Sequence, residues 1–293
     1  MRWLHYPRSR RWGKCFPGTN TGCKLPDFYI QRLNSVMIRL DQLLVDRQLV
    51  TSRAQAQRVI AGGRVHIDQA GWQLATKNSL KLSSDTPVKI EADESDLYVS
   101  RGALKLKAAH DEFKLDFSGL FAIDVGQSTG GFTDYLLQHG ASGVLGIEVG
   151  HDQLAQRLRE DKRVTCLEGY NARELDPALL AYSPADRFDI AVMDVSFISQ
   201  TLILPGLCAL LKPGARLISL VKPQFEVGQE HIGRKGLVKS SELYPILETK
   251  MRDLVSSLGM DVQGYIPSPI KGGDGNQEFI LVAQRVSDIT EYR

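Results

Sequence analysis

Apolar positions follow two different patterns along the chain, and the change falls near residue 95. The part before it combines short stretches at helical spacing with short alternating stretches, which predicts a small α+β unit. Beyond it, compact apolar runs alternate with helical stretches, which predicts a parallel sheet with crossover helices. The polar stretch at residues 91–96 is the expected linker. We therefore expect an extension at residues 1–36, units at 37–95 and 96–287, and a tail at 288–293.

The small unit is expected to contain two helices followed by short strands. The first helix starts next to Arg39, and Asp41 is expected to lie off its leucine-lined face. A second helix is expected over residues 53–61, because the Thr-Ser pair before it can cap its start and the Gly-Gly pair after it can end it. Alternating apolar positions predict strands at residues 65–67 and 88–90.

Cations and polar side chains gather at the starts of these helices and after the Gly-Gly turn. Such side chains can bind phosphates, which fixes the register of an RNA without reading its bases. A solvated helix face explains the same charges equally well on composition alone. The candidate RNA contacts are Arg39, Ser52, Arg53, Gln57, Arg58 and Arg64.

The large unit is expected to form a seven-stranded mixed α/β sheet. Its first five strands are separated by connections long enough for crossover helices, so they are expected to run parallel. A Gly-rich hairpin joins the last two strands, which are expected to close an antiparallel edge. The expected strands cover residues 120–125, 143–147, 164–167, 188–194, 216–222, 260–266 and 278–283.

A Gly-rich turn follows the first of these strands, between Asp124 and a helix expected from about Thr133. Glycines let a ligand approach the backbone, and the start of a helix offers unpaired N–H groups. The glycine spacing differs from that of dinucleotide-binding turns and of P-loops, and no lysine follows the glycines. A triphosphate is therefore not the expected ligand.

Acidic residues at strand ends suggest which ligand the turn binds instead. Glu148 ends the second strand, where a carboxylate accepts hydrogen bonds from both hydroxyls of a ribose. Asp124 can face a cationic tail, and Asn171 is expected near an adenine. A ligand with these features and no phosphate is S-adenosylmethionine, although these residues alone leave a nicotinamide cofactor open. The candidate cofactor contacts are Asp124, Gly126, Ser128, Thr129, Gly130, Gly131, Phe132, Glu148, Asn171 and Asp194.

Composition and charge narrow the function classes. Apolar residues make up 43% of the chain and charged residues 24%, as in globular proteins. No stretch approaches the roughly 18 apolar residues of a membrane-spanning helix, and the cysteines and histidines lack the spacing of a metal site. The net charge of +2 combines +6 in residues 1–36 with −4 in the rest. That first segment is either a basic RNA-binding arm or, as we favour, disordered or upstream sequence that is not normally translated before Met37.

The residues from Arg39 onward resemble the S4 domain, an RNA-binding module of a ribosomal protein, pseudouridine synthases and tRNA ligases. The resemblance rests on Arg39-Leu-Asp-Gln-Leu-Leu, on Ser52-Arg-Ala-Gln-Ala-Gln-Arg-Val-Ile-Ala and on the Gly-Gly-Arg-Val that follows. Gln48 and the turn that starts at His66 depart from the usual pattern without affecting the arginines. The resemblance implies that the candidate arginines bind RNA.

A further set of charged residues belongs to the large unit. Lys105 lies on the helix that enters this unit, and Asp194, Lys222 and Glu278 lie at strand ends. This Lys-Asp-Lys-Glu set resembles the one in ribose 2′-O-methyltransferases of the FtsJ type. With Ser-Arg-Gly-Ala, Asp-Val-Gly-x-Ser-Thr-Gly-Gly-Phe, Lys-Pro-Gln-Phe-Glu, Gly-Asn-x-Glu-Phe and the S4 pattern, the chain is similar to the TlyA/hemolysin A family of ribosomal RNA methyltransferases. Gln127 departs from the small residue usual in the glycine turn.

That similarity implies a Rossmann-like domain that uses S-adenosylmethionine to methylate ribose 2′-hydroxyls of cytidine in ribosomal RNA. The expected partners are ribosomal RNA or ribosomal subunits, and we expect a cytoplasmic monomer without a metal and away from membranes. Three alternatives stay open. They are a membrane-lytic hemolysin, as the older family name suggests, a non-catalytic RNA-binding factor, and a methyltransferase acting on a base or a small molecule.

The four charged residues have expected roles in this reaction. A ribose hydroxyl loses its proton only with help, so the site needs a base and accurate positioning. Lys222 is the candidate for contact with the hydroxyl, and it accepts a proton only in its neutral form. Lys105 would stabilise the developing oxyanion, while Asp194 and Glu278 would orient the two lysines.

Overall fold

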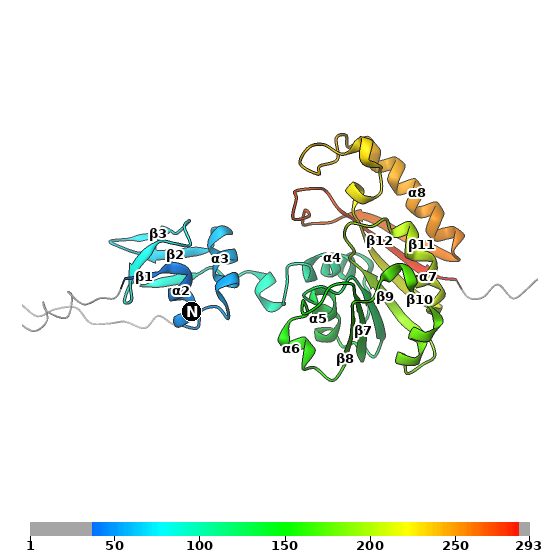
Figure 1. Ribbon diagram of the computed structural model, residues 1–293, viewed down its shortest axis with the longest axis horizontal. Coiled ribbons are helices and arrows are strands. Elements are labelled where there is room, and N and C mark those ends of the chain that lie inside the picture. Colours follow the sequence, from blue (N-terminus) through cyan, green and yellow to red (C-terminus); the bar gives the residue numbers. More distant parts are fainter. Residues whose placement is uncertain (1–36, 287–293) are drawn as a thin grey trace, which may run out of the picture. The chain divides into compact units, whose positions relative to one another are not determined.

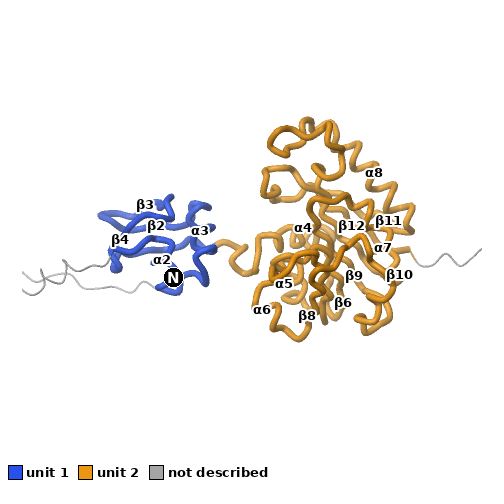
Figure 2. The backbone as a smooth tube through the Cα atoms, viewed as in Figure 1, with its two compact units in different colours: residues 1–92 blue, residues 93–293 orange. Residues whose placement is uncertain are grey.

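The computed structural model describes residues 37–286 of the chain. The expected extension at residues 1–36 and tail at residues 288–293 lie outside the described residues. The chain forms two compact units that divide between Ala92 and Asp93 (Figure 2). Each unit contains its own cluster of buried apolar residues, so each is described by itself.

The small unit packs two helices against two short antiparallel sheets (Figure 1). Strand β1 pairs with β4, and β2 lies between β3 and β5. Both predicted helices and both predicted strands are present, whereas the other three strands were not predicted. The elements are β1 (Met37–Arg39), α2 (Leu40–Asp46), α3 (Arg53–Ala61), β2 (Val65–Asp68), β3 (Trp72–Leu74), β4 (Lys81–Ser83) and β5 (Val88–Ile90).

The ends of α3 follow from local sequence, but one expectation about α2 is wrong. Ser52 caps α3, since its hydroxyl accepts a hydrogen bond from the Gln55 N–H at 3.2 Å. The Gly-Gly pair ends the helix, and Gly63 takes a φ of +69°, which glycine adopts without strain. Asp41 was expected off the buried face, yet it is fully buried. Side chains that approach it from α3 cover its carboxylate, which helical periodicity alone does not reveal.

The large unit alternates strands with helices along most of its length. Its short 3-10 turns include one at Glu94–Leu97, which overlaps the stretch at residues 91–96 that was expected to be the linker. The main elements are α4 (Ala103–Phe113), β6 (Phe121–Val125), α5 (Gly131–Gln138), β7 (Gly143–Glu148), α6 (Gln156–Arg159), β8 (Val164–Glu168), β9 (Phe188–Met193), α7 (Leu204–Ala209), β10 (Leu211–Val221), α8 (Leu243–Ser257), β11 (Met260–Pro267) and β12 (Phe279–Arg285). Helix α5 begins two residues before the expected start, at the last glycine of the turn.

These strands form one seven-stranded mixed sheet in the order β11-β12-β10-β9-β6-β7-β8. The five strands from β10 to β8 run parallel, and β12 pairs antiparallel with both β10 and β11. The predicted mixed sheet with an antiparallel edge is therefore confirmed. Helices α4, α5 and α6 bury their apolar residues on one face of the sheet, and α7 and α8 bury theirs on the other.

The strand directions bring the polar strand ends to one edge of the sheet. Glu148 ends β7, while Asp194 and Lys222 follow β9 and β10, so all three lie at the carboxyl ends of parallel strands. In sheets of this kind ligands bind at that edge. Because β12 is antiparallel, its first residues lie at the same edge, with Phe279 opposite Val221. Glu278, just before Phe279, therefore reaches the edge where Lys222 lies.

No helix within residues 37–286 is long and apolar enough to cross a membrane.

Candidate functional site

Four charged side chains form a row at the carboxyl-terminal edge of the sheet. The Lys105 Nζ lies 2.6 Å from the Glu278 Oε2 and 3.7 Å from the Asp194 Oδ2. The Asp194 Oδ1 lies in turn 2.6 Å from the Lys222 Nζ. Negative and positive groups thus alternate along this charged row. Alternation matters because the four side chains are mostly buried, and an unpaired buried charge is costly.

Ser196 is a neutral residue that contacts the charged row and that was not predicted from the sequence. Its hydroxyl accepts a hydrogen bond from the Lys222 Nζ at 2.8 Å. Asp194 and Ser196 together fix the ammonium of Lys222 from two directions. The one signal in the sequence was the position of Ser196, two residues after Asp194 in the loop that follows a parallel strand.

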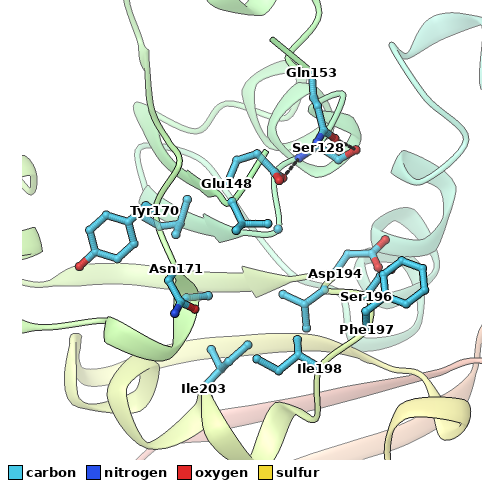
Figure 3. Close-up of a pocket in the computed structure, with 15 residues that line it drawn as sticks. Ser128, Glu148, Gln153, Tyr170, Asn171, Asp194, Ser196, Phe197, Ile198 and Ile203 are labelled. Atoms are coloured by element: carbon cyan, nitrogen blue, oxygen red, sulfur yellow. Dashed lines mark hydrogen bonds between the residues drawn. The ribbon is translucent and has the colours of Figure 1, made fainter. Parts of the chain in front are cut away.

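Two adjoining cavities open beside the charged row. The larger, of about 460 Å³, runs past Glu148 and Asn171 and has apolar walls that include Ile198 (Figure 3). The smaller, of about 290 Å³, is polar and reaches Asp124. The cavities share the lining residues Gly126, Ser128, Asp194 and Ser196, so they meet at the charged row. An apolar slot that continues into a polar pocket suits a ligand with a flat ring at one end and a charged tail at the other.

The predicted cofactor contacts line these cavities with one exception. Gly130 lines neither cavity, because it packs against Leu154 and Leu158. Of the four catalytic candidates, Glu278 is the one that lines neither cavity, and it lies behind Lys105 with its side chain 2% exposed. Lining residues that were not among the predicted contacts include Gln153, Tyr170, Ser196, Phe197 and Ile198.

The glycine turn approaches the end of β9 closely. Gly126 has a φ of +81°, and a Cβ there would lie 2.6 Å from the Asp194 carbonyl oxygen. Only glycine combines that backbone conformation with so close an approach. The turn therefore depends on Gly126 to bring its backbone beside the charged row.

Glu148 is oriented by the turn that it faces. Its Oε2 accepts a hydrogen bond from the Ser128 N–H at 2.8 Å (Figure 3). Its Oε1 accepts one from the Gly150 N–H at 2.7 Å. Each carboxylate oxygen can accept a second hydrogen bond. Glu148 can therefore bind the two hydroxyls of a ribose in the larger cavity while it keeps its backbone partners.

Asp124 lies deeper, under the smaller cavity. Its Oδ2 accepts hydrogen bonds from the Thr133 hydroxyl at 2.7 Å and from the Thr133 N–H at 3.1 Å. Burial raises the pKa of Asp124 to about 7, with a further increase from the negative charge of Asp194, while the hydrogen bonds from Thr133 oppose the shift. A cation brought into the smaller cavity would favour the charged form of this carboxyl group.

An exposed aromatic ring stands at the mouth of the larger cavity. The side chain of Phe197 follows Ser196 and is 90% exposed, with a φ of +64° that phenylalanine rarely adopts (Figure 3). Its ring centroid lies 5.3 Å from that of Phe225. The loop after β9 thus presents an aromatic face beside the charged row.

The unusual Gln127 of the glycine turn fits because of a glycine on the neighbouring strand. Gln127 is 3% exposed, and its Nε2 donates to the Thr133 hydroxyl at 2.8 Å. A Cβ on Gly146 would overlap the amide of Gln127. The bare backbone of β7 at Gly146 therefore provides the space that the long side chain of Gln127 occupies.

A double-mutant cycle tests this pairing. Gly146→Ala should lower the free energy of unfolding by about 1–3 kcal/mol, because the added Cβ would overlap the Gln127 amide. In a Gln127→Ala background the same change should cost at least about 1 kcal/mol less, since the overlap is gone. Urea unfolding of the four proteins gives the coupling energy. Equal costs in both backgrounds would contradict the pairing.

In the small unit, the candidate RNA contacts separate into two groups. Arg39 and Arg53 each place an Nη2 atom 2.9 Å from the Oδ2 of the buried Asp41, and the Gln57 Nε2 lies 3.4 Å from that oxygen. Hydrogen bonding from Arg39, and then from Arg53 and Gln57, holds the pKa of Asp41 well below its usual range. The charges of these two arginines are thus partly offset by Asp41.

The remaining candidates differ in how they are held. Arg58 is exposed, and its side chain forms no hydrogen bond or ion pair with any residue of the range 37–286. Arg64 donates to the Glu91 carbonyl oxygen at 2.7 Å and 3.0 Å. Ser52 acts as the cap of α3. Arg58 therefore presents the least encumbered positive charge of the predicted set.

No group of three His, Cys, Asp or Glu side chains within the described range is arranged to hold a metal ion.

Comparison with known proteins identifies relatives of both units. The FtsJ-like methyltransferase family matches residues 98–285, and the S4 domain matches residues 38–70. A candidate rRNA methyltransferase of Bacillus subtilis, YqxC, is 42% identical over 83% of this chain and 84% of its own length. The 16S/23S rRNA (cytidine-2′-O)-methyltransferase TlyA of Mycobacterium tuberculosis is 38% identical over 85% of this chain and 91% of its own. A solved structure from Streptococcus thermophilus, described as a candidate hemolysin, is 37% identical, with a TM-score of 0.66 over 87% of this chain and 92% of that one.

Proposed function

The chain belongs to the FtsJ-like methyltransferase family, and we propose that it transfers a methyl group from S-adenosylmethionine to ribose 2′-hydroxyls of ribosomal RNA. The observation that carries this proposal is the charged row of Lys105, Asp194, Lys222 and Glu278 at the junction of two cavities. The printed name of the relative from M. tuberculosis gives cytidine as its target, and we extend that target to this chain. We expect a monomer that acts on ribosomal RNA or ribosomal subunits in the cytoplasm.

The residues around the two cavities fit S-adenosylmethionine. We assign the ribose diol to Glu148, the adenine to the apolar slot near Asn171, and the cationic amino-acid tail to the polar pocket above Asp124. The bound cofactor supplies a methyl group on a sulfonium, which is activated for transfer. A dinucleotide fits less well, because the turn lacks the glycine spacing that receives a pyrophosphate.

In this proposal Lys222 contacts the 2′-hydroxyl of the substrate. Asp194 and Ser196 hold its Nζ in a fixed place, so that the hydroxyl lies within hydrogen-bond reach of one defined atom. Lys105, kept in place by Glu278, puts a positive charge beside the oxygen that becomes negative as its proton leaves. The intact charged row argues against the alternative of a non-catalytic RNA-binding factor.

The exposed ring of Phe197 completes the substrate side of the site. We infer that it stacks on the base of the target nucleotide, since stacking on an aromatic ring is worth about 1–3 kcal/mol per base. The S4 domain would hold another part of the RNA through its arginines, without taking part in the chemistry.

Substitutions of Lys222 test its role in proton transfer. Lys222→Ala should bind cofactor and RNA nearly normally but lose about 10²–10⁴ in single-turnover rate, the usual contribution of a positioned base. Lys222→Arg should not restore the rate, because a guanidinium stays protonated. Lys212→Ala is a matched control, since Lys212 lies near the opposite end of β10 and pairs with Asp189. Substantial methylation by Lys222→Arg would mean that the proton leaves to Asp194 or to water instead.

Cofactor binding should release a proton from Asp124. The free protein keeps this carboxyl group protonated up to about pH 7, because burial raises its pKa. A cation bound nearby lowers that pKa, so binding at pH 6–7 should expel up to about one proton. Calorimetry in two buffers of different ionisation enthalpy measures the release. Asp124→Asn should abolish it, and proton uptake by the unmodified protein would contradict the assignment.

Two arginines of the S4 domain should differ in what they do besides binding RNA. Arg53→Ala and Arg58→Ala should each reduce the salt dependence of RNA binding by roughly 0.7–0.9 log units per lost phosphate contact. Only Arg53→Ala should also destabilise the protein, by on the order of 1 kcal/mol, since it removes an ion pair to buried Asp41. Fluorescence anisotropy across salt concentrations and thermal unfolding test both parts. Unchanged RNA binding in Arg58→Ala would remove it from the proposed interface.

A further inference from the structure

We propose that a basic hairpin of the large unit, residues 232–238, is a second RNA-binding surface that holds backbone phosphates beside the charged row. This inference rests on the proposed function and extends it to a surface outside the S4 domain. The hairpin lies in the segment between Lys222 and α8. Figure 1 shows this segment in yellow, next to the orange-red loop that leads into β12.

The two cations of the hairpin, Arg234 and Lys235, lie at its tip. A bridge between Ile232 and Val238 closes it, and the Gly236 N–H donates to the Gly233 carbonyl at 2.9 Å. Arg234 and Lys235 are therefore the two central residues of a β-turn, whose side chains point away from the body of a protein. Both are exposed, and neither forms an ion pair with any residue whose structure is described.

A buried asparagine keeps the hairpin at the site. Asn276 is 3% exposed, its Oδ1 accepts from the Val238 N–H at 3.0 Å, and its Nδ2 donates to the Gly236 carbonyl at 2.8 Å. Asn276 belongs to the loop that ends at Glu278. That loop lies against the charged row, since a Cβ on Gly272 would be 2.7 Å from the Glu278 Oε1. The hairpin is thus anchored to the structure that carries Glu278.

Charge points to a polyanion as the occupant. From Ile232 to Lys239 the segment contains three cations and no acid, whereas residues 37–293 as a whole have a net charge of −4. A polypeptide with a negative net charge binds RNA only through local positive surfaces. Guanidinium and ammonium groups on an open turn suit phosphate oxygens, which an RNA strand supplies next to any ribose in the site. Part of the charge of the S4 domain is, by contrast, already offset by Asp41.

The test compares two double variants of equal charge change. Arg234→Gln with Lys235→Gln removes the cations of the hairpin. Lys114→Gln with Lys162→Gln removes two exposed lysines that precede β6 and β8, at the opposite edge of the sheet. The full-length protein is titrated with ribosomal RNA fragments across salt concentrations. Methylation rates are measured against RNA concentration, and cofactor binding by calorimetry.

In the hairpin variant, the slope of log affinity against log salt concentration should be smaller in magnitude by roughly 1.4–1.8, which corresponds to two lost phosphate contacts. The variant should also bind RNA roughly tenfold more weakly near 0.1 M salt. Its KM for RNA should rise while the rate at saturating RNA and the cofactor affinity stay near those of the unmodified protein. The control variant should match the unmodified protein throughout.

Equal salt slopes for the hairpin and control variants would overturn the inference, even if both proteins methylate RNA. Loss of binding to phosphatidylserine vesicles without loss of RNA binding would overturn it in favour of a membrane surface. Failure of the unmodified protein to methylate ribosomal RNA would instead refute the proposed function. The slope comparison is a binding measurement, so it still decides whether the hairpin contacts RNA.

Discussion

The antiparallel pairing of β12 with β10 is the constraint on which the charged row depends. Val221 lies opposite Phe279 in this register, so Lys222 after one strand and Glu278 before the other reach the same edge. A parallel β12 would carry Glu278 to the far edge of the sheet. With Glu278 in place, Lys105 lies between two carboxylates, and no charge of the row is buried without an opposite neighbour.

Much of the large unit could be predicted from the sequence, because its strands are compact apolar runs that end in polar residues. Runs such as Phe188–Met193 are buried on both faces, and the residue after each run must lie at the ligand-binding edge. Asp194 and Lys222 were found by this reasoning. Glu278 and Lys105 were singled out through the resemblance to ribose 2′-O-methyltransferases, and the antiparallel pairing of β12 explains why Glu278 reaches the same edge.

What escaped prediction depends on contacts between segments far apart in the sequence. Asp41 looks like a polar flank of its own helix, and only arginines on both sides of it explain its burial. Ser196 is significant because Lys222, from another strand, reaches its hydroxyl. The left-handed conformation of Phe197 contradicts the preference of its residue type, so no local rule predicts it. Gly130 packs against Leu154 and Leu158, which its place in the glycine turn did not indicate.

The buried carboxylate of Glu226 joins the two loops that carry Asp194 and Lys222. The Glu226 Oε2 accepts from the Ser199 hydroxyl at 2.6 Å, and its Oε1 accepts from the Gln200 N–H at 2.8 Å. Burial raises the pKa of Glu226, and these two hydrogen bonds oppose that rise. A carboxylate can attract the long side chain of a lysine in many relative positions. Proton transfer is stricter, because the group that accepts the proton must lie within hydrogen-bond reach of the hydroxyl that loses it. Fixing the backbones of both loops through Glu226 narrows those relative positions, so the distance between Asp194 and Lys222 is set by the fold as well as by their charges.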